Sequence, residues 1–154
     1  MMIAVGEQAP EATFEGPDGM ETSLAAWRGK PLVLYFYPKD DTSGCTREAQ
    51  DFTALADAFQ GAGVALLGVS KDSAKKHKAF TEKYVLKVPL ATDADGKLLE
   101  AFGAWIEKSM YGRKYMGVDR STFLIDKDGE IVRAWRKVKV PGHADEVLKA
   151  AQAL

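Results

Sequence analysis

Hydrophobic and polar positions along the chain change their period several times, and each change marks a new element. The run Leu32–Tyr37 is continuously apolar and too short for a core helix, which predicts a strand buried on both faces. From Thr42 onward, apolar residues recur at three- and four-residue spacing until Gly61, which predicts one helix that begins just past the strand. A second apolar run at 64–69 predicts another buried strand.

The flanking segments continue the alternation of strands and helices. Near the start, the turn Gly16-Pro17-Asp18-Gly19 predicts a small hairpin, and Ser23 is placed to cap a short helix that follows it. The remaining predicted elements are a helix at 74–84, a short strand at 88–91, a helix at 97–102, two strands at 121–125 and 131–135 joined by a turn, and a helix at 144–153.

Strands separated by helices, followed by a hairpin and a closing helix, predict an α/β protein with a central mixed sheet covered on both faces. This is the element order of a thioredoxin-like fold with an N-terminal β-hairpin extension. No repeat or long linker divides the chain, so residues 1–154 are expected to form one domain. The aromatic, glycine-punctuated stretch 103–117 is expected to pack over the sheet edge or to border the active site.

Composition narrows the function classes. The chain has 154 residues and 21 Lys plus Arg against 22 Asp plus Glu, so the basic surface of a nucleic-acid binder is not expected. No run approaches the roughly 18 apolar residues of a membrane span, and no leader pattern opens the chain, which predicts a cytoplasmic protein without a membrane partner. With one cysteine and two distant histidines, His77 and His143, neither a metal centre nor a cofactor is expected.

The only thiol, Cys45, falls in the first turn of the helix predicted after the buried strand. Free backbone N–H groups and the helix dipole favour a thiolate there. A dipole contributes about 0.3–1 kcal/mol, which changes the thiol–thiolate equilibrium by less than about tenfold, so a second cation must help. The alternative is that Cys45 is merely a small buried hydrophobe.

Thr42 stands three residues before Cys45, about one helical turn away. Its hydroxyl is placed either to hydrogen-bond the thiolate or a substrate oxygen, or simply to cap the helix. Both interpretations remain open from the spacing alone.

The pattern Pro38-x-x-x-Thr42-x-x-Cys45 resembles the active-site signature of the peroxiredoxins. The longer window around it is similar to the bacterioferritin-comigratory, or Q-type, branch of that family. The resemblance extends to the opening segment Gly6–Pro10 and to Arg120–Asp126, which is similar to the family's late arginine-bearing strand, so it covers nearly the whole chain.

This resemblance implies roles for individual residues. Cys45 would be the peroxidatic cysteine, Thr42 the hydroxyl that holds the peroxide, and Arg120 the activating cation. The resemblance also assigns Pro38, Gly44 and Glu48 to substrate binding, with Pro38 shielding the site. The implied activity is a thiol-dependent peroxidase that reduces hydrogen peroxide and organic hydroperoxides through a cysteine sulfenic acid.

Two positions depart from the Q-type pattern. The resolving cysteine often found five residues after the first is Gln50 here, and Ser43 replaces a common proline. With no second thiol, a 1-Cys mechanism is implied, regenerated by an external thiol such as thioredoxin, glutaredoxin or glutathione. The branch is often monomeric, so a monomer is expected. The alternative function is a non-enzymatic peroxide sensor or binding module switched by oxidation of Cys45.

Overall fold

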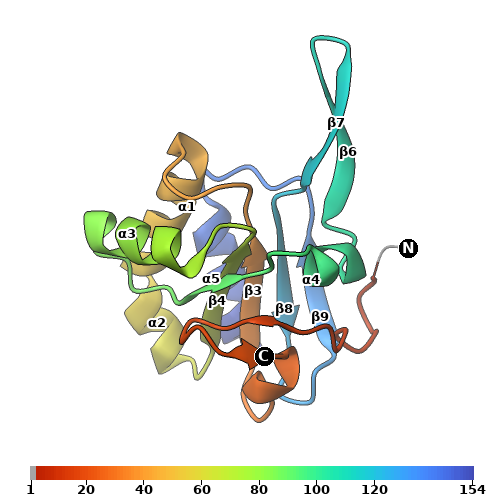
Figure 1. Cartoon of the computed structure of the whole chain (residues 1–154). Helices are drawn as coiled ribbons and strands as arrows, with labels where there is room; N and C mark the ends of the chain where they lie inside the picture. The colour runs from red at the N-terminus through yellow and green to blue at the C-terminus, as the bar shows by residue number, and fades with distance from the viewer. Residues whose placement is uncertain (1–2) are drawn as a thin grey trace.

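The central strand of the protein is buried along its whole length, as its apolar run predicts. The computed structural model describes residues 3–154. Its main sheet has seven strands in the order β2-β1-β5-β4-β3-β8-β9 (Figure 1). These strands are β1 Phe14–Glu15, β2 Glu21–Thr22, β3 Leu32–Phe36, β4 Ala65–Ser70, β5 Leu90–Thr92, β8 Ser121–Ile125 and β9 Ile131–Trp135.

Strand directions confirm the predicted mixed sheet. β3 pairs in parallel with β4 on one side and antiparallel with β8 on the other. Phe36, the last residue of β3, is paired with Ser121, the first residue of β8. The chain leaving β3 toward Cys45 and the residue entering β8, Arg120, therefore meet at the same edge of the sheet.

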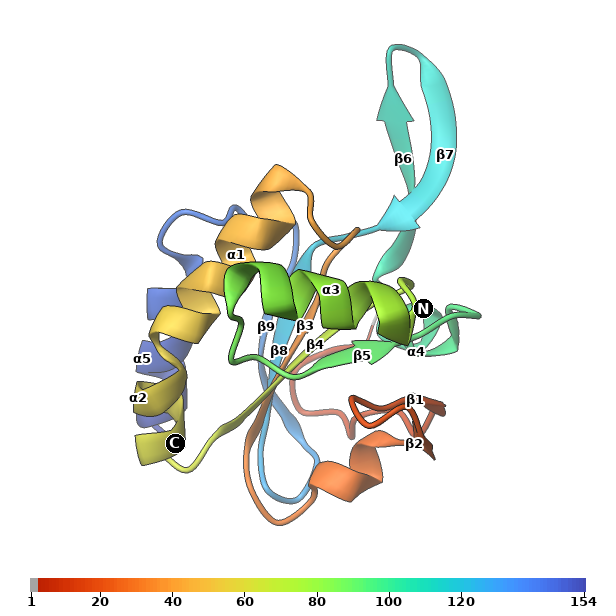
Figure 2. The ribbon, with the colours of Figure 1, turned by 60° about the vertical axis from the view of Figure 1, so that its left-hand side comes forward.

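The helices lie on both sides of this sheet. They are η1 Leu24–Trp27, α1 Ser43–Ala54, α2 Ala56–Gly61, α3 Ala74–Tyr84, α4 Lys97–Ala101 and α5 His143–Gln152. α1, α2, α3 and α5 contribute to the core on one face of the sheet, and η1 and α4 contribute to the core on the other. Figure 1 shows α1, α2 and α3 to the left of the sheet and α4 to the right, and Figure 2 shows α5 beside α2. None of the helices in residues 3–154 has the length and apolar character needed to cross a membrane.

Successive side chains of β3 point to opposite faces of the sheet, so this one strand contributes to the hydrophobic core on each face. Phe36 packs with Phe102 and Phe123 in the core under α4, where the Phe102 and Phe123 ring centroids are 4.7 Å apart. Tyr35 stacks on Phe52 of α1 at 4.7 Å in the opposite core, which also contains Cys45. Burial on both faces explains why this strand has no polar alternation.

Two predicted helices differ from those observed. The helix predicted from Thr42 to Gly61 is broken at Leu55, whose backbone leaves the helical range and whose N–H bonds to Phe52 instead of a residue four back. Neither glycine nor proline marks the break, so no local signal predicts it. The segment after Ser23 is a 3₁₀ helix, and the Ser23 side chain makes no capping hydrogen bond.

The expectation that residues 103–117 pack over the sheet edge is wrong for most of this stretch. It forms a separate two-stranded hairpin, β6 Trp105–Met110 and β7 Arg113–Val118, which projects from the body of the molecule (Figure 1). Tyr111 at its tip is fully exposed. Trp105 at its base packs against the core, so only the root of the hairpin is buried.

Gly68 in β4 tests how tightly the sheet packs beneath α1. A Cβ atom on Gly68 would lie 2.8 Å from Cζ of Tyr35 and 2.9 Å from Cδ2 of Leu90. We expect Gly68→Ala to lower the free energy of unfolding by about 1–3 kcal/mol, because neither neighbour has room to move in a close-packed core. Urea denaturation measures the change.

Gly61 provides the matched control, because it is helical and a Cβ there meets nothing within 4 Å. Gly61→Ala should raise the free energy of unfolding by about 0.4–1 kcal/mol through the unfolded chain's lost freedom. Equal effects of the two substitutions would contradict the packing argument.

Candidate active site

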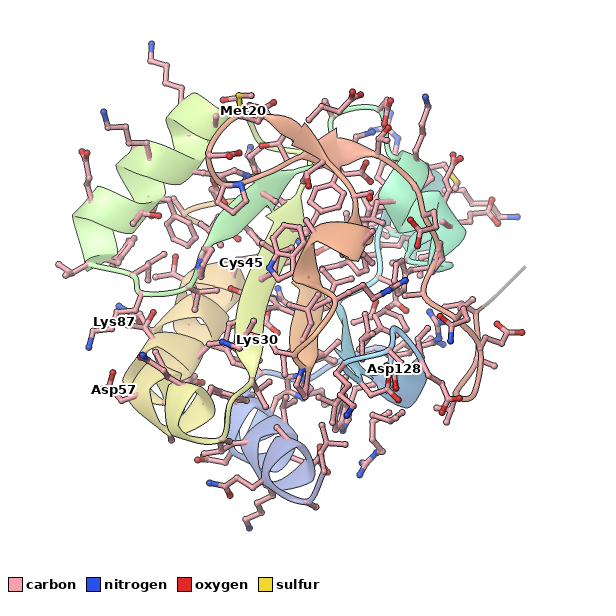
Figure 3. The ribbon with its side chains drawn as sticks, turned by 90° about the horizontal axis from the view of Figure 1, so that it is seen from below. Met20, Lys30, Cys45, Asp57, Lys87 and Asp128 are labelled. Atoms are coloured by element: carbon pink, nitrogen blue, oxygen red, sulfur yellow. The ribbon has the colours of Figure 1, made fainter. Side chains whose placement is uncertain are left out.

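Cys45 lies in the first turn of α1, the helix that follows the buried strand β3. Residues 37–42 connect the two elements, and Cys45 is the third residue of the helix. The residue is only 2% exposed, and in the view from below it projects onto the middle of the molecule while Met20 and Asp57 lie at the outline (Figure 3). Helix geometry leaves the first amides of α1 without an intrahelical acceptor, so their positive ends surround this turn.

Arg120 brings a cation directly to the sulfur. Its Nη2 donates to Cys45 Sγ at 3.3 Å, and its Nη1 donates to Glu48 Oε1 at 2.6 Å. Cys45 and Glu48 are three residues apart on α1 and therefore share one face of the helix. A single planar guanidinium can thus bridge both side chains, a geometry that the point charge of lysine does not reproduce.

Gly44 allows this close approach. A Cβ at position 44 would lie 3.2 Å from Nη2 of Arg120, tighter than ordinary van der Waals contact. Gly44 is one of the residues that the family resemblance assigns to substrate binding, and the structure places it against the guanidinium of Arg120. Its missing side chain lets the guanidinium lie over the first turn of α1.

Glu48 is a buried carboxyl with an unusual balance of forces. Its side chain is 2% exposed, and its second oxygen, Oε2, has no hydrogen-bond partner among the described residues. Burial raises the pKa of Glu48 to about 7, against the opposing attraction of Arg120. Burial lowers the pKa of Arg120, but the neighbouring Glu48 and Cys45 outweigh it and leave the pKa above its usual value.

Thr42 stands at the N-cap position of α1, but its side chain makes no capping bond. The hydroxyl instead donates to the backbone oxygen of Lys39 at 2.8 Å. The capping interpretation is therefore wrong for the side chain. Because the hydroxyl proton is committed to a backbone oxygen, the lone pairs of Thr42 are left to accept a hydrogen bond from another group.

The loop before α1 carries Pro38 and one residue in a rarely used conformation. Pro38 is exposed to solvent. Asp41 has φ 60°, in the left-handed region that few residues other than glycine adopt. Hydrogen bonds from Lys83 and Tyr84 of α3 hold it there and lower the pKa of the Asp41 carboxyl.

Both histidines are buried, which sequence reasoning missed for His77. The lysines around it predict a polar helix face, but the ring lies inward between Asp40 and the backbone oxygen of Ala91. A single sequence carries no signal for this burial, because it depends on α3 packing against the loop after β3. His143 lies 2.8 Å from Thr122, and burial lowers the pKa of His143 to about 4.

Comparison with known proteins agrees with this architecture. The AhpC/TSA family model matches residues 5–134. The peroxiredoxin Bcp of Xanthomonas campestris is 50% identical over 95% of this chain and 94% of its own length, and that of Bacillus subtilis is 46% identical over 97% and 95%.

Solved structures give the same result. Peroxiredoxin Q of Xanthomonas campestris superposes with a TM-score of 0.90 at 48% identity, covering 97% of each chain. A further Xanthomonas campestris structure, of the bacterioferritin comigratory protein and described in terms of its alkyl peroxide reduction activity, also gives a TM-score of 0.90, at 47% identity and 98% coverage of both chains. This chain therefore belongs to the AhpC/TSA family and, within it, to the Bcp/PrxQ peroxiredoxins, thiol peroxidases that share its thioredoxin-like fold.

Proposed function

We propose that this chain reduces hydrogen peroxide and organic hydroperoxides by a 1-Cys mechanism, with Cys45 as the attacking sulfur. The observation that carries the proposal is the 3.3 Å contact from Arg120 Nη2 to Cys45 Sγ in the first turn of α1. A guanidinium and a helix N-terminus that converge on one sulfur favour the thiolate, the reactive form. Organic substrates are supported by the alkyl peroxide reduction ascribed to the Xanthomonas campestris relative.

In the proposed step, the Cys45 thiolate attacks one oxygen of the peroxide in line with the O–O bond. An S–O bond forms, the O–O bond breaks, and the leaving oxygen takes a proton to depart as water or an alcohol. The sulfur is oxidised to sulfenic acid and the peroxide is reduced. Thiolate formation alone gives about 30-fold over an ordinary thiol, so positioning and charge stabilisation must supply the rest.

The surrounding residues are proposed to divide that work. Thr42 accepts a hydrogen bond from the peroxide, because its own proton is given to Lys39. Arg120 stabilises the charge that develops on the leaving oxygen. Pro38, exposed on the loop, shields the sulfur from solvent, while Gly44 and Glu48 let Arg120 lie against the sulfur.

Regeneration is proposed to use an external thiol. Gln50 occupies the position where a resolving cysteine often stands, and Cys45 is the only cysteine of the chain. One thiol condenses with the sulfenic acid to give a mixed disulfide and water, and a second thiol releases Cys45 as thiol with formation of the external disulfide. Thioredoxin, glutaredoxin or glutathione of a reducing compartment such as the cytoplasm meets this need. Because one chain supplies every residue of the site, the proposed active unit is a monomeric single domain.

Steady-state peroxide consumption tests the function. With dithiothreitol in excess, the wild-type protein should consume many equivalents of hydrogen peroxide, and Cys45→Ser should consume none above background, because no other thiol exists. A wild-type protein that uses one equivalent and stops would support the sensor instead. Mass spectrometry of the oxidised protein in the presence of glutathione should show a mixed disulfide at Cys45.

Arg120→Lys tests the bridging guanidinium. We expect the rate constant for oxidation of Cys45 by hydrogen peroxide to fall by about 10²–10³-fold, because a lysine cannot contact Glu48 and the sulfur together. Stopped-flow fluorescence or competition with a second peroxidase measures the rate. Arg133→Lys, on β9 and outside the site, is the control and should leave the rate unchanged. A similar loss in both variants would count against the proposal.

The pKa of Glu48 predicts a pH dependence of stability. Because the pKa is about 7 in the folded protein against an ordinary 4.5, the fold favours the protonated carboxyl. The advantage is complete below pH 4.5 and is lost as the pH rises from 4.5 to 7. The free energy of unfolding of wild type minus that of Glu48→Gln should therefore fall across this window in urea titrations. Glu82 is exposed on α3, so the same difference for Glu82→Gln should not change with pH. A free energy of unfolding that changes with pH in the same way for wild type and Glu48→Gln would refute the argument.

A further inference from the structure

A buried polar cluster lies beneath the loop that precedes Cys45 and has no part in the steps above. His77 of α3 is 5% exposed, with Nδ1 at 2.7 Å from Asp40 Oδ2 and Nε2 at 3.0 Å from the backbone oxygen of Ala91. Tyr37 donates its hydroxyl proton to the other Asp40 oxygen at 2.6 Å. The ring therefore ties α3 to β5 on one side and to the active-site loop on the other.

Both ring nitrogens of His77 face oxygen atoms. The Ala91 oxygen can only accept, so Nε2 carries a proton. Nδ1 lies 2.7 Å from Asp40 Oδ2 and 3.3 Å from the hydroxyl oxygen of Tyr37. A buried hydrogen bond therefore joins the ring to the carboxyl group of the loop.

Asp40 is held from every side. Both of its carboxyl oxygens are engaged by His77 and Tyr37, and its backbone N–H donates to Asp72 Oδ2 at 2.9 Å. The same Asp72 oxygen accepts from Ser70 at the end of β4 at 2.7 Å. The ends of β3 and β4, together with α3, thus fix one residue of the loop.

The residue after Asp40, Asp41, has a strained backbone that the restraint of Asp40 helps to maintain. Its left-handed backbone, φ 60°, is costly for an aspartate and persists only where the surroundings impose it. Lys83 and Tyr84 restrain its side chain from the exposed part of α3, and His77 restrains the preceding residue from the buried part. Thr42 follows immediately, so the direction of its hydroxyl depends on this bend.

We propose that His77 is a positioning residue for peroxide reduction: through Asp40 it holds the loop in the bend that aims Thr42 at the substrate. The inference rests on the proposed function of Cys45 and Thr42. His77 touches neither the sulfur nor the place of the peroxide, so it acts only through the loop. Arg120 lies just before β8 and makes no contact with His77 or Asp40, so the cation at Cys45 does not depend on this cluster.

The proposal is tested by comparing a reaction that needs a correctly placed Thr42 with one that needs only the Cys45 thiolate. In His77→Phe, which keeps a ring but removes both ring nitrogens, we expect the rate of Cys45 oxidation by hydrogen peroxide to fall about 10–100-fold, the scale of a misplaced reacting group. Alkylation of Cys45 by iodoacetamide at pH 7, which reports the thiolate, should change less than about twofold. A parallel fall of both rates would overturn the proposal.

A double-mutant cycle with Thr42→Val asks whether His77 acts through that hydroxyl. In the Thr42→Val background, His77→Phe should change the peroxide rate by less than about twofold. A loss as large as in the wild-type background would show that the effect does not pass through Thr42. Val88→Ala, which removes buried volume from the core that α3 covers, controls for destabilisation and should leave the peroxide rate unchanged.

If His77→Phe fails to fold, Tyr37→Phe removes a single donor to Asp40 and provides the same comparison of rates with a smaller expected loss, about 3–10-fold. An unchanged peroxide rate in folded Tyr37→Phe would count against the proposal. Wild-type protein that reacts slowly with peroxide would instead refute the proposed function, so the two failures are distinct.

Discussion

The structure of the site depends on one guanidinium shared between a sulfur and a carboxylate. Arg120 contacts Cys45 with one nitrogen and Glu48 with another. Both contacts form because Cys45 and Glu48 lie on the same face of α1. Burial of a charged arginine is unfavourable unless its donors find acceptors, and Glu48 supplies one of them. The same carboxyl, itself poorly solvated, takes up part of the positive charge that would otherwise act on the sulfur alone.

The fold supplies this arrangement through the direction of its strands. β3 ends at the edge of the sheet from which the chain runs to Cys45, and Arg120 immediately precedes the antiparallel strand β8 at that same edge. The two residues are far apart in the sequence, yet the register of a single strand pair brings them together. The strand register therefore fixes where α1 and Arg120 meet, and the loop that holds Thr42 is restrained separately.

Much of this follows from the sequence, where local signals are strong. The apolar runs of β3 and β4, the helix at 74–84 and the position of Cys45 at a helix start are all visible in residue periodicity. The contact from Arg120 to the sulfur is implied by the motif resemblance and is present in the structure. The pairing of Arg120 with Glu48, the approach permitted by Gly44 and the burial of His77 depend on tertiary packing, which no local pattern encodes. The β6–β7 hairpin was missed because its strands alternate weakly and its aromatic residues indicate burial, whereas Tyr111 points into solvent.

The uncapped start of α1 has a consequence for the oxidised enzyme. A serine or threonine cap typically adds about 1 kcal/mol to the stability of a helix, and here the Thr42 side chain withholds that contribution from the first turn. The first turn of α1, which encloses the sulfur, is held by Arg120 and by the backbone bond from Thr46 to Thr42 instead of by a side-chain cap. In the proposed mechanism, an external thiol meets the buried sulfur by displacing this one turn, and an uncapped turn costs less to displace than a capped one.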